Sequence, residues 1–185
     1  MLAAETLVKT RPEVSIRHAA VADAAAVRRF IFEIRAAYGV PVDLEGLDAD
    51  LTDFGNPRTS GGMHFVADFD GTPVGSVVLT PQGRHRVKLS KLFVHSAFRG
   101  FGLGRRLLRK AVSEVEAQGY REIFLTTRAR YREAIQLYES EGWTRRPDQY
   151  GPGPERIYAL PLPTCLVDCG HPLPYLPRKG EGHSI

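Results

Sequence analysis

The chain has 185 residues, of which 25% are charged and 43% hydrophobic, and its formal net charge is +4 at pH 7. This length and mixture suit one globular domain with a hydrophobic core rather than a disordered chain. The mild basic excess forms no stripe of interleaved basic and aromatic residues, so no nucleic-acid partner is expected. The 2 cysteines are too few for a disulfide framework.

The ends of the chain differ from its middle in composition. Glu5 and Lys9 interrupt the apolar residues near the amino terminus, so no signal peptide is expected, and no run approaches the ~18 apolar residues of a membrane span. We therefore predict a cytoplasmic protein with no membrane partner. Residues 1–13 are expected to form a flexible arm, residues 14–162 the domain, and residues 163–185 a Pro-rich tail. The cysteines and histidines of that tail are too weakly spaced to predict a metal site.

Hydrophobic periodicity and turn residues predict an alternation of strands and helices. In chain order we expect a strand at 14–18, helices at 24–38 and 43–54, strands at 63–69, 74–80 and 87–94, a helix at 104–118, a strand at 122–127, a helix at 134–142, and strands at 144–146 and 156–160. Asp23 stands at the N-cap position of the first helix. Asp70 and Gly71 form the pair that is typical of a tight hairpin turn.

The strand at 87–94 and the helix that follows it are joined by a glycine-rich turn. The end of this strand is apolar on both faces, which is typical of a central strand covered by helices. Gly100, Gly102 and Gly104 leave a turn without side chains at a helix N-terminus, so backbone N–H groups and the helix dipole can act on one anion. Arginines surround this turn, and guanidinium groups match phosphate geometry. These features predict a site for a phosphate-bearing ligand.

The spacing of the glycines narrows the class of ligand. A dinucleotide fold needs G-x-G-x-x-G after its first strand, and a P-loop needs a Lys-Ser or Lys-Thr pair after its glycines; neither pattern is present. The pattern is R-G-x-G-x-G over residues 99–104. It closely resembles the pyrophosphate signature of the GNAT superfamily, the acyl-CoA-dependent N-acyltransferases. A second pattern, A-x-x-L-Y-x-x-x-G-W over residues 134–143, is similar to another signature of that family.

This resemblance implies a fold, an activity and a set of site residues. The fold is of the α/β (α+β) class, with a central mixed, mostly antiparallel sheet of about six to seven strands flanked by about four helices. The activity is transfer of an acetyl group from acetyl-CoA to an amine of a small molecule or peptide by direct attack. The resemblance places the pantetheine of CoA along Leu92, Phe93 and Val94, and gives Tyr138 the role of general acid toward the leaving thiolate. The residues implied for the pyrophosphate are Arg99, Gly100, Phe101, Gly102, Leu103, Gly104 and Arg105.

One position departs from the family pattern. Many relatives carry a glutamate on the central strand as general base, and Lys88 stands there in this chain. His64, His85, His95 or ordered water are the alternatives, and an acceptor amine of low pKa would need no strong base. The charge of the acceptor is also undecided, since acidic residues over 43–53 favour a cation whereas Lys88 and the arginines near residue 130 favour a carboxylate.

Two functions of other classes are alternatives to the acetyltransferase activity. The missing strand carboxylate is compatible with a non-catalytic acyl-CoA-binding sensor or subunit. The glycine turn alone is compatible with a nucleotide-binding regulatory domain, which would bind ATP or GTP without competition from CoA. A homodimer is compatible with the sequence but is not indicated by any pattern in it.

Overall fold

The computed structural model describes residues 12–42, 48, 51–56, 61–147 and 155–163. These residues form a seven-stranded sheet in the order β1-β2-β3-β4-β5-β7-β6. β4 and β5 are parallel, and every other neighbouring pair is antiparallel. The strands are β1 (Ser15–His18), β2 (Met63–Phe69), β3 (Thr72–Pro81), β4 (Arg86–Val94), β5 (Glu122–Arg128), β6 (Thr144–Arg145) and β7 (Glu155–Pro161).

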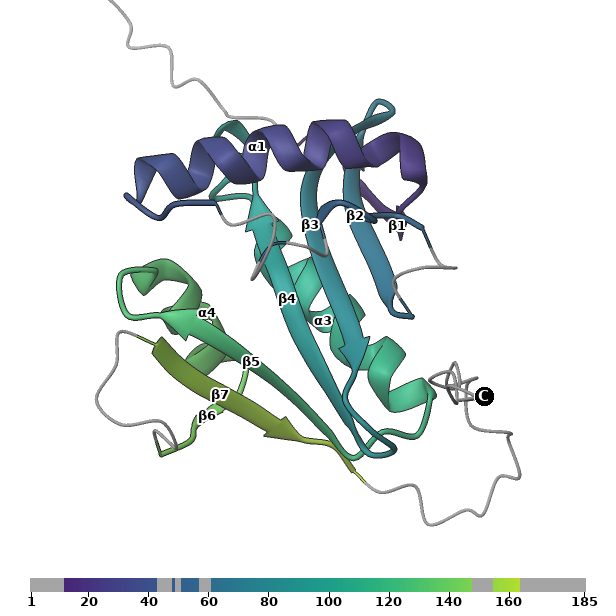
Figure 1. The fold of residues 1–185 in the computed structure, drawn as a ribbon, viewed down its shortest axis with the longest axis vertical. Coiled ribbons are helices and arrows are strands. Elements are labelled where there is room, and N and C mark those ends of the chain that lie inside the picture. Colours follow the sequence, from purple (N-terminus) through teal and green to yellow (C-terminus); the bar gives the residue numbers. More distant parts are fainter. Residues whose placement is uncertain (1–11, 43–47, 49–50, 57–60, 148–154, 164–185) are drawn as a thin grey trace, which may run out of the picture.

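The described helices lie on both faces of this sheet (Figure 1). They are α1 (Ala24–Ala37), α3 (Leu103–Ala117) and α4 (Arg132–Ser140), with short 3-10 turns at Val21–Asp23 and Ser96–Phe98. The predicted α/β class and the mixed, mostly antiparallel sheet are confirmed. The predicted helix at 43–54 falls largely outside the described residues, as do the arm before residue 12 and the tail after residue 163. No helix of the described residues has the length and apolarity to cross a membrane.

The apolar runs of β2 and β3 are explained by burial on both faces. Phe65 and Val77 pack against α3, whereas their chain neighbours Val66 and Val78 pack against α1. The face toward α3 also receives Tyr138 of α4. Because successive strand residues point to opposite faces, a strand that is covered on both sides must be apolar throughout. Figure 1 shows α1 crossing the strands on one side while α3 runs along the other.

The start of α1 differs from the simple N-cap that the sequence predicts. Asp23 is the N-cap residue but makes no side-chain bond to α1. Its carboxylate instead accepts hydrogen bonds from the Ala20 N–H at 2.8 Å and from Arg17 at 2.7 Å. Arg17 also donates to Asp68 of β2 at 2.6 Å. These bonds to Arg17 and to Ala20 hold the pKa of Asp23 below its usual value, and they fasten the start of α1 to β1 and β2.

The sheet opens in its middle, between β4 and β5. These two strands pair only from Arg86 to Leu89 of β4, opposite Glu122 to Leu125 of β5. Beyond that point they diverge, as Figure 1 shows. A β-bulge in β4 contributes to this divergence, because Lys91 and Leu92 together lie opposite the single residue Val77 of β3. A bulge bends the strand that carries it and increases its twist.

Candidate active site

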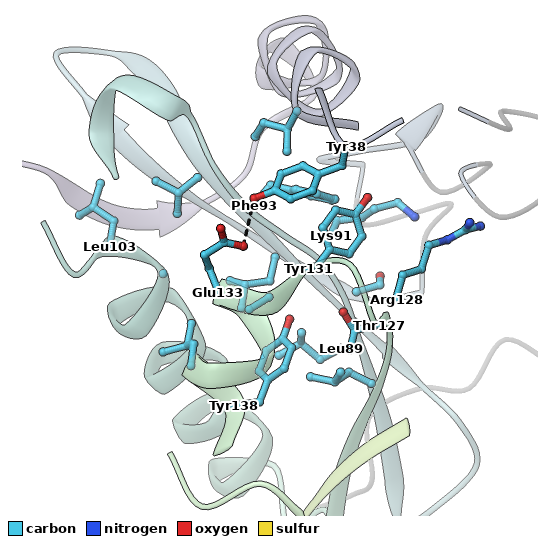
Figure 2. A pocket seen from close by; sticks show the side chains of 18 of the residues that line it. Tyr38, Leu89, Lys91, Phe93, Leu103, Thr127, Arg128, Tyr131, Glu133 and Tyr138 are labelled. Atoms are coloured by element: carbon cyan, nitrogen blue, oxygen red, sulfur yellow. Dashed lines mark hydrogen bonds between the residues drawn. The ribbon is translucent and has the colours of Figure 1, made fainter. Parts of the chain in front are cut away.

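A cleft of about 640 Å³ occupies the space where β4 and β5 part. Its lining comes from β4, the glycine turn, the start of α3, the end of β5 and α4, with Ile34, Arg35, Tyr38 and Asp48 closing it from the side of α1. Figure 2 shows side chains from these separate segments converging on one cavity. Of the site residues predicted from the sequence, all except Phe101 line this cleft.

The β4 wall of the cleft is shaped by the bulge at Lys91. This residue has a φ of 53°, in the left-handed region that non-glycine residues seldom adopt. The Ser76 hydroxyl donates to the Lys91 carbonyl at 2.8 Å, and the Lys91 ammonium lies 3.0 Å from the Asp48 carboxylate. Asp48 is 1% exposed and also forms an ion pair with Arg35 of α1. The unusual backbone of β4 is therefore held from two sides, by a hydrogen bond and by a buried ionic cluster.

The glycine turn has the geometry of an anion cradle. Gly100 and Gly102 have φ values of 82° and 76°, and a Cβ built on either would meet no protein atom within 4 Å. Gly102 is the N-cap residue of α3, so the first N–H groups of that helix have no partner within the helix. At Gly104 an added Cβ would lie 3.4 Å from Leu137. The turn thus leaves open space in front of backbone donors at the positive end of a helix dipole.

Two arginines beside this turn are held by contacts within the protein. The Arg99 Nε donates to the Val94 carbonyl at 3.1 Å, across the end of β4. Arg105 lies 2.8 Å from the Glu141 carboxylate, and the neighbouring Arg109 reaches the same carboxylate at 2.7 Å. Arg105 lines the cleft and Arg109 does not. Positive charge therefore stands at the mouth of the cradle on Arg99, which is exposed, and on Arg105, whose side chain is 50% exposed.

Tyr138 projects from α4 into the deeper part of the cleft. The residue is 5% exposed, and its ring lies 5.9 Å from that of Trp143 and 6.0 Å from that of Tyr158. Figure 2 shows its hydroxyl directed into the cavity near Leu89 and Thr127. Burial raises the pKa of this phenol well above its usual value, because the phenolate would be poorly solvated. Tyr138 is thus packed as a core residue and still presents a protonated hydroxyl to the cavity.

A second group of polar side chains bridges the cleft near α1. The Tyr38 hydroxyl donates to the Glu133 carboxylate of α4 at 3.1 Å, and the Tyr131 ring lies 4.9 Å from the Tyr38 ring. Arg130 donates to the Tyr38 carbonyl at 2.8 Å. Burial is the main cause that raises the pKa values of Tyr38 and Tyr131. No sequence pattern assigned a role in the site to Tyr38, Tyr131 or Glu133.

The histidines proposed as substitute bases lie elsewhere in the structure. His64 is 6% exposed, and its Nδ1 accepts a hydrogen bond from the Gly55 N–H at 2.8 Å. The His95 Nδ1 accepts from the Ala97 N–H, and His85 is exposed on the turn before β4. None of the three is among the described residues that line the cleft, whereas Lys88 is. The carboxylates found in the lining are Asp48, Glu133 and Glu155.

A comparison of the sequence with known protein families agrees with the fold and with the site. Residues 28–143, more than half of the chain, match the family described as the acetyltransferase (GNAT) family. The chain belongs to the GNAT acetyltransferase family. A relative described as the uncharacterized N-acetyltransferase YjgM of Escherichia coli is 28% identical over 137 residues, which cover 69% of this chain and 80% of that protein. N-acetyltransferase family 8 member 3 of Rattus norvegicus is 30% identical over 66% of this chain and 57% of its own length.

Solved structures of GNAT proteins share the fold. An acetyltransferase of the GNAT family from Staphylococcus aureus superposes with a TM-score of 0.71 at 21% identity, over 82% of this chain and 100% of that chain. The yncA acetyltransferase of Salmonella typhimurium, solved with its cofactor acetyl-CoA, gives a TM-score of 0.66 at 21% identity, over 86% of this chain and 99% of that chain. At these identities the structural similarity establishes the fold alone. The substrate has to be inferred from the residues of the cleft.

Proposed function

We propose that this protein is an N-acetyltransferase that uses acetyl-CoA as its donor and an amine of a small molecule or peptide as its acceptor. The observation that carries the proposal is the combination of an anion cradle and a buried, protonated phenol in one cleft, in a chain of the GNAT family. The fold shared with a GNAT protein that holds acetyl-CoA supports the choice of donor.

The residues of the cleft fit CoA at both of its ends. The turn from Gly100 to Gly104 would receive the pyrophosphate, since a cradle free of side chains and backed by a helix N-terminus suits a doubly charged anion. Arg99 and Arg105 would add charge-assisted hydrogen bonds to it. The backbone of Leu92 to Val94 would receive the pantetheine, because the edge of β4 that faces β5 has no strand partner beyond Leu89 among the described residues. Bound acetyl-CoA would supply a thioester as the acyl donor.

The transfer exchanges one bond for another at the amine nitrogen and at the thioester sulfur. The amine nitrogen forms a bond to the acyl carbon and loses a proton, while the carbon–sulfur bond breaks and the sulfur gains a proton. Tyr138 is the residue that we assign to the second proton, because its hydroxyl faces the cavity and stays protonated well beyond neutral pH. Desolvation that raises the pKa of the phenol would also make a thiolate in the same cavity more basic, so proton transfer between them remains feasible.

The first proton has no side-chain base assigned to it. Among the carboxylates of the lining, Asp48 is paired with two cations, Glu133 accepts a hydrogen bond from Tyr38, and Glu155 lies opposite Arg128 in the β5–β7 register. Lys88 offers an amine in place of the family's usual carboxylate. We infer that the acceptor amine reacts from its neutral form and that its proton leaves to water. Nearby cations disfavour a protonated amine, so the electrostatics of the cleft would increase the neutral fraction.

The competing function is a non-catalytic acyl-CoA-binding protein, which the lysine at position 88 favours. Amine-dependent release of CoA thiol from acetyl-CoA, measured across a panel of small amines and peptides, separates the two. We expect thiol release that requires the amine and is matched by an N-acetylated product in the mass spectrum. CoA binding without thiol release from any amine would support the sensor, and tight ATP or GTP binding without CoA competition would support a nucleotide-binding domain.

A further inference from the structure

The charged residues at the acceptor end of the cleft include more cations than carboxylates. Once Arg99 and Arg105 are assigned to CoA, the remaining lining holds four cations and three carboxylates. The members of this group are Arg35, Lys88, Lys91, Arg128, Asp48, Glu133 and Glu155. Arg35 and Lys91 are occupied by Asp48. Glu133 accepts a hydrogen bond from Tyr38. Lys88 and Arg128 are the cations of this group that form no ion pair with a residue that the structure describes.

Strand register places Lys88 and Arg128 on the same face of the sheet. Lys88 lies opposite Phe124 of β5, and Arg128 follows Phe124 by four residues, an even step that returns to the same face. Their backbone positions are thus separated by about 13 Å along the strand direction. An extended lysine side chain and an extended arginine side chain can each cover part of this distance. The residues that alternate with them, Leu89 and Leu125, are buried on the opposite face with Tyr138.

The guanidinium of Arg128 is available for a ligand. No ion pair or side-chain hydrogen bond joins it to any residue that the structure describes, although Glu155 lies directly opposite it in the β5–β7 register. Arg128 and Lys88 are both partly buried, so a bound anion would be less screened there than on an open surface. Figure 2 shows the Arg128 side chain extending from the end of β5 beside the cavity.

We propose that the acceptor is a small amine that carries a carboxylate, such as an α-amino acid, and that Arg128 with Lys88 binds this carboxylate. This inference rests on the proposed acetyltransferase function and names its substrate class. Arg128 offers a planar pair of donors that matches a carboxylate, and Lys88 adds a point charge. Binding of the carboxylate by these two cations would also reduce the need for a general base. A free carboxylate stabilises the ammonium form of a neighbouring amine, and binding the carboxylate to two cations removes that stabilisation.

The test compares matched acceptors that differ only at the carboxylate. Each of several α-amino acids is offered with acetyl-CoA beside its carboxamide and its decarboxylated amine, and kcat/KM is measured from thiol release. We expect each acid to exceed its carboxamide by about tenfold or more, as for a charge-assisted hydrogen bond gained. This preference runs against simple reactivity, since the amine of a carboxamide is the less basic and more often neutral. Carboxamides or decarboxylated amines that match or exceed the acids would overturn the inference while leaving the acetyltransferase intact.

Variants then assign the preference to the two cations. Arg128→Met and Lys88→Met should each lower kcat/KM for the acids about tenfold or more and lower the values for the carboxamides by much less. Arg29→Met removes the same charge from an exposed position of α1 outside the cleft lining, and it should change neither class. Equal losses for acids and carboxamides, or a loss of CoA affinity alone, would show that Arg128 serves another purpose.

A binding measurement separates failure of this inference from failure of the enzyme function. N-acetyl amino acids and their carboxamides are titrated by calorimetry into the CoA-loaded protein, in wild-type and Arg128→Met forms. If no amine is turned over but the acids still bind more tightly through Arg128, the carboxylate site stands and the acetyltransferase proposal fails. If neither form discriminates between acid and carboxamide, the carboxylate site is wrong whatever the turnover.

Discussion

The two walls of the cleft are built from the sequence in different ways. One wall is a single continuous stretch, in which β4 runs through the glycine turn into α3. The other wall is assembled from five separate places, namely the end of α1, Asp48, the end of β5, α4 and the start of β7. The continuous wall carries the proposed CoA contacts together with Lys88, and the assembled wall carries the phenol and Arg128.

This difference explains why the family comparison indicates the acyl donor and does not indicate the acceptor. A turn and a helix N-terminus are local structures, so a short pattern of glycines is enough to specify an anion cradle. The assembled wall depends on tertiary packing, and a change at any one of its segments alters the acceptor site without disturbing the cradle. We therefore expect CoA binding to depend on the continuous wall, and acceptor choice and chemistry to depend on the assembled wall. The predictions below test this division.

The largest effect is expected for Tyr138→Phe, which keeps the ring and removes only the proton donor. If the phenol protonates the leaving thiolate, kcat should fall by ~10²–10⁴ while the KM for acetyl-CoA changes little. Because burial raises the pKa of Tyr138 above its usual value, deprotonation of this residue should not reduce wild-type kcat at any pH below about 10. Steady-state kinetics from pH 6 to 10 measure both quantities.

Tyr158→Phe is the matched control for that variant. Its ring packs against Tyr138, but its hydroxyl donates to Glu139 at 2.7 Å and the residue does not line the cleft. Removing that hydroxyl should leave kcat within about twofold and cost roughly 0.5–1.5 kcal/mol of stability at most. A Tyr138→Phe enzyme with full activity across the range would make Tyr138 a core residue and assign the proton to water.

A large loss of stability is expected for Asp48→Asn. This carboxylate is 1% exposed and contacts both Arg35 and Lys91, so its removal leaves two cations near one another without their shared anion. Breaking a buried ionic cluster in this way should lower the free energy of unfolding by about 3–5 kcal/mol. Denaturant unfolding measures the loss. Asp53→Asn, at an exposed position nearby, should stay within about 0.5 kcal/mol of wild type, and an equally small effect at Asp48 would contradict the role of the cluster.

The glycine turn allows a comparison of two substitutions with equal backbone strain. Gly102 and Gly83 have φ values of 76° and 80°, and a Cβ on either would meet no protein atom within 4 Å. Replacing either by alanine should cost about 1–2 kcal/mol of stability for the left-handed conformation. Only Gly102→Ala places a methyl group in the cradle, so it alone should weaken CoA binding, by about a hundredfold if two charge-assisted bonds are lost. Calorimetric titration with CoA would refute the cradle if both variants bind equally well.

The smallest of these effects is expected at the arginines of α3. Arg105 and Arg109 share the Glu141 carboxylate, but only Arg105 lines the cleft. Arg105→Ala should therefore raise the dissociation constant of CoA about tenfold, whereas Arg109→Ala should leave it unchanged. An equal change in both variants would mean that the effect comes from the general field of the helix surface rather than from a contact with phosphate.

The continuous wall is also the part that the sequence predicts well. Amphipathic periods and turn glycines locate β4 and α3 to within a residue or two, because local pattern and burial agree there. The double burial of β2 and β3 is visible as apolar runs for the same reason. Tyr138 enters the predicted site through its place in the second signature, and the structure puts it in the cleft with the glycine turn.

The assembled wall could not be predicted in the same way, and neither could the bulge within β4. The bulge at Lys91 has no local signal, because a lysine with positive φ is held there by Ser76 and Asp48, which are distant in the sequence. The contact between Tyr38 and Glu133 joins residues 95 positions apart. His64 looked available as a base, but it serves the fold by accepting from the Gly55 N–H. Side-chain roles that depend on long-range packing need the structure.

Hydrogen–deuterium exchange with and without CoA tests the division between the walls most directly, since it requires no substitution. CoA bound as proposed should slow exchange of the amides in residues 92–106, where the backbone of β4 and the start of α3 would donate to the ligand. Exchange in residues 65–68 of β2, which are already paired on both sides, should not change. Unchanged exchange over residues 92–106 at saturating CoA, or protection confined to another part of the chain, would contradict the account.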